Sequence, residues 1–144
     1  MQNIMPHLTL TRLNGQRWRK YLLICLPIVT MPFPLLAVDV VVVVHPGLRV
    51  SRSEVVHIYR GELSGYRVYE LNDAHWQEAF CRDYLNMTAS DLKYIQDQAL
   101  YAGRALPPRK LDDVQDMLDA ISQTPNAIGY LPSAAVTDAV QVVK

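Results

Sequence analysis

Two arginines and a serine form a cluster whose residue types could do chemistry. Arg49, Ser51 and Arg52 flank the start of a predicted helix. Backbone N–H groups and the positive end of the helix dipole attract anions at such a position, and guanidinium groups add charged hydrogen bonds. The cluster therefore indicates an anion site. The alternative is a solvated helix cap without a ligand, because Ser51 and Glu54 have the spacing of a capping box.

Other reactive residue types have simpler interpretations. His45, His57 and His75 match no spacing of metal ligands, so we expect no metal and no other cofactor. Cys81 has no base near it in the sequence and partly joins an apolar helix face, which is typical of a small buried hydrophobe rather than a nucleophile. We therefore expect a protein that is not an enzyme.

The elements that must position these residues alternate between strand and helix patterns. The first strand pattern is a continuous run of β-branched residues, which is typical of a strand buried on both faces. The others are shorter runs between turn residues. Strands are expected at 39–46, 66–71, 126–131 and 138–143.

Four helices are expected between these strands. Ser51 should cap the first helix, which stops at Gly61, and Asp73 should cap the second. The third should run from about residue 90 to 102, before Gly103. The fourth is indicated by an apolar stripe. Its members are Leu111, Val114, Leu118 and Ile121. The order of one strand, one helix, one strand, three helices and two strands predicts an α/β fold with a mixed sheet flanked by helices.

The first 37 residues have the features of a cleavable signal peptide. They contain four basic residues and no acidic one, and an apolar run over 21–37 follows and ends at the small Ala37. Three prolines and the short length of this run argue against a membrane-spanning helix. We expect a signal peptide over 1–37, a domain over 38–144 and a periplasmic location. An uncleaved membrane anchor is the alternative.

Removal of this signal leaves an acidic domain. Ten of the 14 basic residues and all 14 acidic residues remain, which gives a net charge of −4. This balance argues against a nucleic-acid partner. Cys81 is then the one cysteine left, so no disulfide can form within the domain. About a hundred residues permit a single hydrophobic core.

An ordered set of motifs in this domain resembles the phosphate-type periplasmic substrate-binding proteins. The segment 124–131, Thr-Pro-Asn-Ala-Ile-Gly-Tyr-Leu, is close to the family's T-P-G-A-I-G-Y. The other matching segments are 45–62, 78–85 and 101–108. The resemblance implies one lobe of the type 2 periplasmic-binding-protein fold. It also implies a role related to phosphate ABC transport, a small oxyanion such as phosphate as ligand, and a membrane transporter or sensor protein as partner.

Two departures from the family pattern concern the ligand. Family members place a Gly-Ser-Gly-Thr turn at the helix start that holds phosphate, whereas this chain has Asp73-Ala74-His75-Trp76 there. A carboxylate occupies the same positive dipole end as an anion would, so Asp73 should repel phosphate. One lobe also buries less of a small solute than the cleft between two lobes does.

We therefore expect an exported solute-binding-like module with weak or altered anion binding. Its candidate ligand-binding residues are Arg49, Ser51, Arg52 and His75. The alternative is a ligand-free periplasmic adaptor that uses the same fold to bind another protein. The sequence leaves open the ligand, the oligomeric state and the protein partner.

Overall fold

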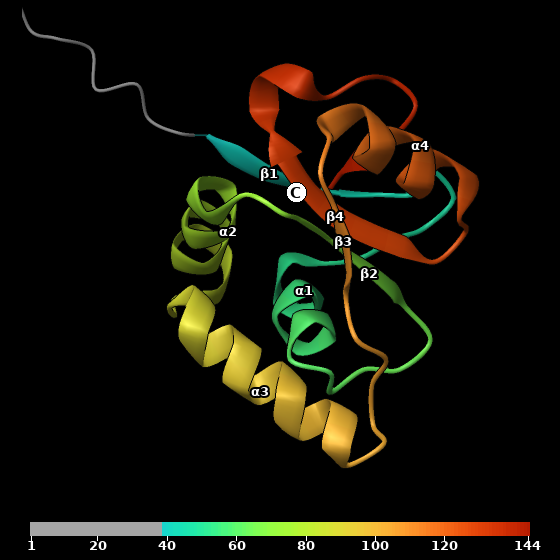
Figure 1. Ribbon diagram of the computed structural model, residues 1–144. Coiled ribbons are helices and arrows are strands. Elements are labelled where there is room, and N and C mark those ends of the chain that lie inside the picture. The colour runs from blue at the N-terminus through green and yellow to red at the C-terminus, as the bar shows by residue number, and fades with distance from the viewer. Residues whose placement is uncertain (1–38) are drawn as a thin grey trace, which may run out of the picture. The chain divides into compact units, whose positions relative to one another are not determined.

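The computed structural model describes residues 39–144, which form a mixed sheet with helices on both faces (Figure 1). The predicted signal peptide over 1–37 lies outside these residues. The strands are β1 (Val40–Val44), β2 (Arg67–Leu71), β3 (Arg109–Leu111), β4 (Ala127–Pro132) and β5 (Gln141–Val142). The helices are α1 (Arg52–Tyr59), α2 (Ala74–Phe80), α3 (Ala89–Tyr101) and α4 (Val114–Gln123), with a π-helical turn η1 (Cys81–Leu85) and a 3-10 turn η2 (Ser133–Ala135).

The strands lie in the order β3-β2-β4-β1-β5, and their directions are mixed as the sequence predicts. β2 is parallel to both β3 and β4, whereas β1 is antiparallel to β4 and β5. We call the end of the sheet where β2, β3 and β4 begin its amino end, and the end where they stop its carboxyl end. Val44 and Val68 both pair with Ile128, so β1 stops at the amino end, where β2 begins.

β1 has the burial expected of its β-branched sequence. Val42, Val43 and Val44 are at most 1 % exposed, and the strand lies between β4 and β5 rather than at an edge. The prediction of a strand buried on both faces is therefore confirmed.

Two neighbouring residues of β4 show how the helices cover the sheet. The Tyr130 ring stacks on Phe80 of α2 with the ring centroids 4.4 Å apart. A Cβ atom added to Gly129 would lie 2.6 Å from Met117 and 2.8 Å from Ile121, both in α4. Because successive strand residues point to opposite faces, α2 and α4 must cover opposite faces. Figure 1 shows α1 and α3 on the side of α2.

The helix boundaries follow the caps that the sequence predicts. Ser51 begins α1, Asp73 begins α2, and α1 and α3 are followed by Gly61 and Gly103 in the left-handed conformation, with φ of 70° and 66°. The second helix continues from α2 into η1 and stops at Asn86, which also has a positive φ. No helix within residues 39–144 has the length and apolar character to cross a lipid bilayer.

The third helix has the predicted extent, but the start of the fourth differs from the prediction. Residues 109–111 form the edge strand β3, which the sequence analysis missed, because it has three residues and two of them are charged. Leu111 belongs to this strand, and Asp113 caps α4 after it. Leu111 was expected in the helix because it is three residues before Val114, which is the spacing of neighbours on one helix face. β5 is also shorter than the predicted run over 138–143.

Candidate anion-binding site

Glu54 occupies the start of α1, where the sequence indicates an anion site. The Ser51 side chain accepts a hydrogen bond from the Glu54 backbone N–H at 3.3 Å. In return the Glu54 carboxylate accepts from the Ser51 backbone N–H at 2.8 Å and from the Ser51 hydroxyl at 2.7 Å. These bonds form a complete capping box, so the chain's own carboxylate takes the position at which an anion would bind.

The capping box also keeps Glu54 charged. Hydrogen bonds from the side chain and then the backbone of Ser51 lower the pKa of the Glu54 carboxyl below its ordinary value of 4.5. Glu54 is therefore ionised at neutral pH. A second anion at this helix start would therefore meet the negative charge of Glu54.

The two arginines of the predicted cluster have different surroundings. Arg52 donates a hydrogen bond to the Asp83 carbonyl at 2.9 Å, and its guanidinium carbon lies 4.5 Å from the centroid of the Tyr84 ring. It therefore fastens α1 to η1. Arg49 is exposed and lines a groove of about 930 Å³ together with Ser51. The charged residues of this groove are Arg49, Lys144, Glu54 and Asp138, so its charges balance.

His75 lies at a separate place, in the first turn of α2. The Asp73 carboxylate caps this helix and accepts from the backbone N–H groups of His75 at 2.9 Å and Trp76 at 3.4 Å. The His75 ring packs edge-on against Trp76. Asp83, the residue that Arg52 contacts, lies eight residues after His75 in the same helical segment. At a rise of 1.5 Å per residue, this separation is about 12 Å. The structure therefore brings Arg49 and Ser51 together but leaves His75 apart from them.

The carboxyl end of the sheet carries negative charge. This is the end at which open α/β sheets usually bind their ligands. Asp73 follows β2, and Asp112 and Asp113 follow β3, all three exposed. Asn72 joins the two loops by donating to Asp112 at 2.7 Å.

The remaining helix starts are closed in the same way. Asp113 accepts from the Gln115 backbone N–H at 2.6 Å at the start of α4. At the start of α3, Asp91 accepts from the Thr88 backbone N–H at 3.3 Å and completes a second capping box. Each α-helix in residues 39–144 therefore begins at a carboxylate of its own chain. The helix dipoles of this part of the chain are satisfied internally rather than by a ligand.

A buried carboxylate is the main polar feature that the sequence analysis missed. Glu70 of β2 is 2 % exposed and accepts hydrogen bonds from Gln96 at 2.8 Å and Gln77 at 3.3 Å. Burial raises its pKa, against smaller opposing effects of the Gln96 hydrogen bond and the Lys110 charge. No sequence signal marks Glu70, because it occupies an ordinary position in an alternating strand.

Cys81 is buried, as the sequence predicts. Burial raises the pKa of its thiol to about 12, and the charges of Glu70 and Glu78 act in the same direction. The thiol is therefore protonated at neutral pH and has little nucleophilic reactivity.

The sequence matches no protein-family model and no curated protein. Two solved structures have a similar fold. One is an ABC-type phosphate transport receptor from Vibrio cholerae, which is 14 % identical in sequence and has a TM-score of 0.45. The similar region covers 73 % of this chain and 45 % of that receptor. The second is a protein assigned as a phosphate ABC transporter substrate-binding protein, solved with bound phosphate, from Clostridium perfringens. It is 17 % identical, with a TM-score of 0.54, and 73 % of this chain and 44 % of the other are covered.

The second structure shows the fold of residues 39–144. The domain has a single-lobe fold of the periplasmic-binding-protein type. The chain spans less than half the length of either solved structure. The predicted fold class is confirmed, including the mixed sheet flanked by helices.

Proposed function

We propose that this chain is an exported, single-lobe solute-binding-like module with weak or altered anion binding. The fold supports this function, because the similar structure from Clostridium perfringens is assigned as a substrate-binding protein of a phosphate ABC transporter. The same likeness supports a periplasmic location and a membrane transporter or sensor protein as partner. The proposed role is binding rather than catalysis, in keeping with a buried, protonated Cys81.

The observation that carries the proposal is the closure of the helix starts by carboxylates. In a site that uses helix N-termini, phosphate is held by vacant backbone N–H groups and the positive dipole end. Here the Asp73 carboxylate accepts from two N–H groups in the first turn of α2, and the Glu54 carboxylate accepts from the N–H of Ser51, the residue that caps α1. A phosphate at either place would have to displace a carboxylate or lie beside it. Both alternatives reduce its affinity.

A phosphate titration followed by NMR tests this proposal. In the wild-type protein, the amide signals of His75 and Trp76 should shift little at millimolar phosphate. In Asp73→Asn the cap remains but the negative charge is lost, so these amides should respond to phosphate. The control is Glu78→Gln, which removes an exposed carboxylate from the body of the same helix. Equal responses in the two variants would show that Asp73 is not what weakens phosphate binding.

A ligand-free protein-interaction adaptor is the second candidate. It is favoured by large apolar side chains exposed on α3 and in the loop that follows it. These are Tyr94 at 66 %, Leu100 at 42 %, Tyr101 at 87 % and Leu106 at 67 %. Exposed apolar residues gathered in one region are typical of interaction surfaces.

Photo-crosslinking in intact cells tests the adaptor. A crosslinking amino acid at position 101 should give a specific protein adduct. The same amino acid at the exposed position 119, on α4, should give none. Equal labelling from the two positions, or no adduct from position 101, would contradict the adaptor.

A further inference from the structure

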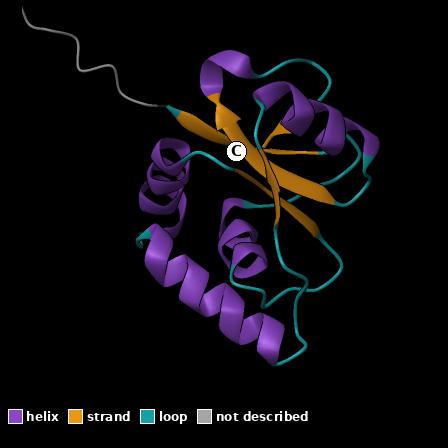
Figure 2. Ribbon diagram, in the orientation of Figure 1, coloured by secondary structure: helices purple, strands orange, loops and turns teal. Residues whose placement is uncertain are grey.

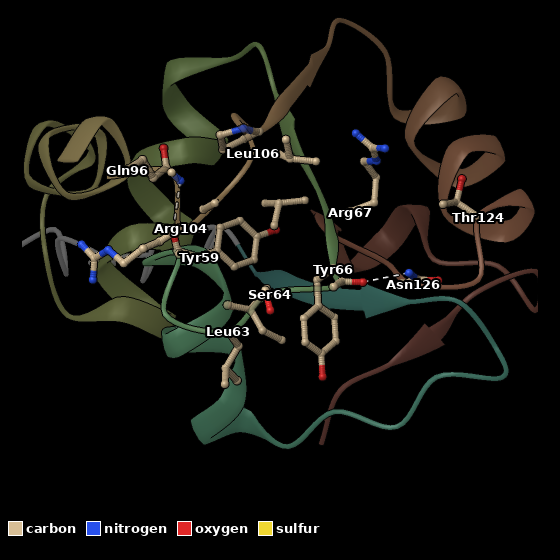
Figure 3. A pocket seen from close by; sticks show the side chains of 17 residues that line it. Tyr59, Leu63, Ser64, Tyr66, Arg67, Gln96, Arg104, Leu106, Thr124 and Asn126 are labelled. Carbon is tan, nitrogen blue, oxygen red and sulfur yellow. Dashed lines mark hydrogen bonds between the residues drawn. The ribbon is translucent and has the colours of Figure 1, made fainter. Parts of the chain in front are cut away.

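A second cavity lies at the amino end of the sheet, away from the capped helix starts. It has a volume of about 370 Å³, within the range of roughly 300–1,000 Å³ usual for small-molecule sites. Its walls come from the loop after α1, the start of β2, the loop after α3 and the residues that precede β4 (Figure 3). Figure 2 shows the two loops, at 60–66 and 102–108, side by side at one end of the domain.

The backbone around this cavity is held in place by close contacts. Gly61 has a φ of 70°, and a Cβ atom added there would lie 2.7 Å from Ala99 and 2.8 Å from Ala105. The α1 loop therefore packs tightly against both α3 and the loop that follows it. On the opposite wall, the Asn126 side chain donates to the Gly65 carbonyl at 2.8 Å. These contacts make the cavity a preformed feature of the fold.

The charge of the cavity is positive. Arg67 and Arg104 line it, and the described residues that line it include no Asp or Glu. Neither guanidinium group forms an ion pair with a carboxylate in residues 39–144. The charge of Arg104 contributes to lowering the pKa of the nearby Glu62, but the hydrogen bond from His57 is the largest cause of that shift. The ion-pair partner of Glu62 is Arg60. The two arginines are therefore available to an anion.

The rest of the lining is largely apolar, with polar groups interspersed. Leu63 and Leu106 stand at its rim, 38 % and 67 % exposed, and Tyr59 lies in the wall between Arg67 and Arg104 in Figure 3. Gln96 is already bonded to Glu70, so it is fixed in place. A ligand that suits this cavity needs both an apolar body and a negative charge.

We propose that this cavity binds a small organic anion, with its carboxylate or sulfonate group on Arg67 or Arg104 and its apolar body against Leu63 and Leu106. The proposal rests on the proposed function as a solute-binding module, and it names the altered ligand of that module. The anion site then lies at the amino end of the sheet, opposite the acidic carboxyl end.

Fluorescence titration of the full exported chain with anilinonaphthalene sulfonate tests the site, because this probe combines an aromatic body with a sulfonate. Saturable binding at one site is expected. The double variant Arg67→Gln with Arg104→Gln should weaken it by about tenfold or more, as the loss of a charged hydrogen bond does. The control is Arg82→Gln with Arg109→Gln, which removes the same charge from exposed positions outside the cavity.

Competition experiments separate charge from apolarity. Benzoate should displace the probe, whereas benzyl alcohol, which has the same ring without the charge, should not. Thermal unfolding of each variant should be cooperative, which shows that the variants are folded and that the probe signal does not come from unfolded chains. Wild-type-like binding by the cavity variant, equal weakening in both double variants, or no saturable binding would overturn the proposal. Phosphate titrated into the same proteins reports on the helix starts, so failure of this site is distinguishable from failure of the proposed function.

Discussion

Ser51 and Glu54 satisfy each other at the start of α1. Each residue accepts a hydrogen bond from the backbone N–H of the other, at 2.8 Å and 3.3 Å. The sequence predicts an anion site at the start of α1, but the hydrogen bonds between Ser51 and Glu54 occupy this position. The same residues therefore explain both why α1 begins where it does and why it is poorly suited to hold a ligand there.

Replacement of the cap residue should destabilise the domain by a predictable amount. Ser51→Ala leaves the Glu54 backbone N–H without its side-chain acceptor, which typically costs about 1 kcal/mol. Chemical denaturation measures this cost as a shift of the midpoint. The exposed Ser90, for which no side-chain hydrogen bond is seen, serves as the control position. An unchanged midpoint for Ser51→Ala would show that the cap does not stabilise α1.

The close approach of β4 to α4 should not tolerate a methyl group. In Gly129→Ala the new Cβ atom would overlap the side-chain ends of Met117 and Ile121, which must move to admit it. Overpacking of this kind costs roughly 1–3 kcal/mol. The control is Gly47→Ala in an exposed turn, where the added Cβ atom would lie 3.3 Å from Nδ1 of the His45 side chain, so only a small shift of that ring is needed and a change within about 0.5 kcal/mol is expected. Thermal unfolding of both variants gives the comparison, and equal stabilities would contradict the packing described.

Glu70 should make the stability of the domain depend on pH. Burial raises its pKa in the folded state above the ordinary value of 4.5. Its contribution is therefore fully present below about pH 4.5 and is lost as the pH rises through the higher folded pKa. A glutamine at this position would not titrate, so Glu70→Gln should gain stability relative to the wild type between about pH 4 and pH 7.

Denaturation curves of Glu70→Gln across this pH range provide the measurement. The exposed Glu78→Gln is the matched control. A stability difference between wild type and Glu70→Gln that stays constant with pH would show that Glu70 does not titrate as described.

The order of basic residues, apolar run and Ala37 predicts cleavage near Val38. Exported protein should begin at Val38 or within a few residues of it, as N-terminal sequencing of periplasmic material would show. Soluble periplasmic protein that retains Met1 would contradict this processing.

The sequence predicts the local elements well where local chemistry decides them. The β-branched run of β1, the Ser51 cap and the glycines after α1 and α3 each contain their own physical reason within a few residues. β3 has no such signal, because its three residues become a strand only by pairing with β2. Leu111 was misplaced for the same reason.

The candidate sites depend on contacts that are distant in sequence, so they could be predicted less well. Arg67 and Arg104 are 37 positions apart, and their common cavity arises from the packing of two loops around Gly61. The separation of His75 from Ser51 follows from the Arg52 contact with Asp83, which no local pattern contains. The closing of α2 by Asp73 was predicted, because an N-cap acts over three residues.

Calorimetric titration of the phosphate-free exported protein with inorganic phosphate tests the central claim most directly. With Glu54 and Asp73 at the helix starts, we predict a dissociation constant weaker than about 1 mM, which corresponds to less than about 4 kcal/mol of binding free energy. A micromolar dissociation constant at one site per chain, with shifts of the His75 and Trp76 amide signals, would contradict the account, because Asp73 would then have to yield these backbone N–H groups to phosphate.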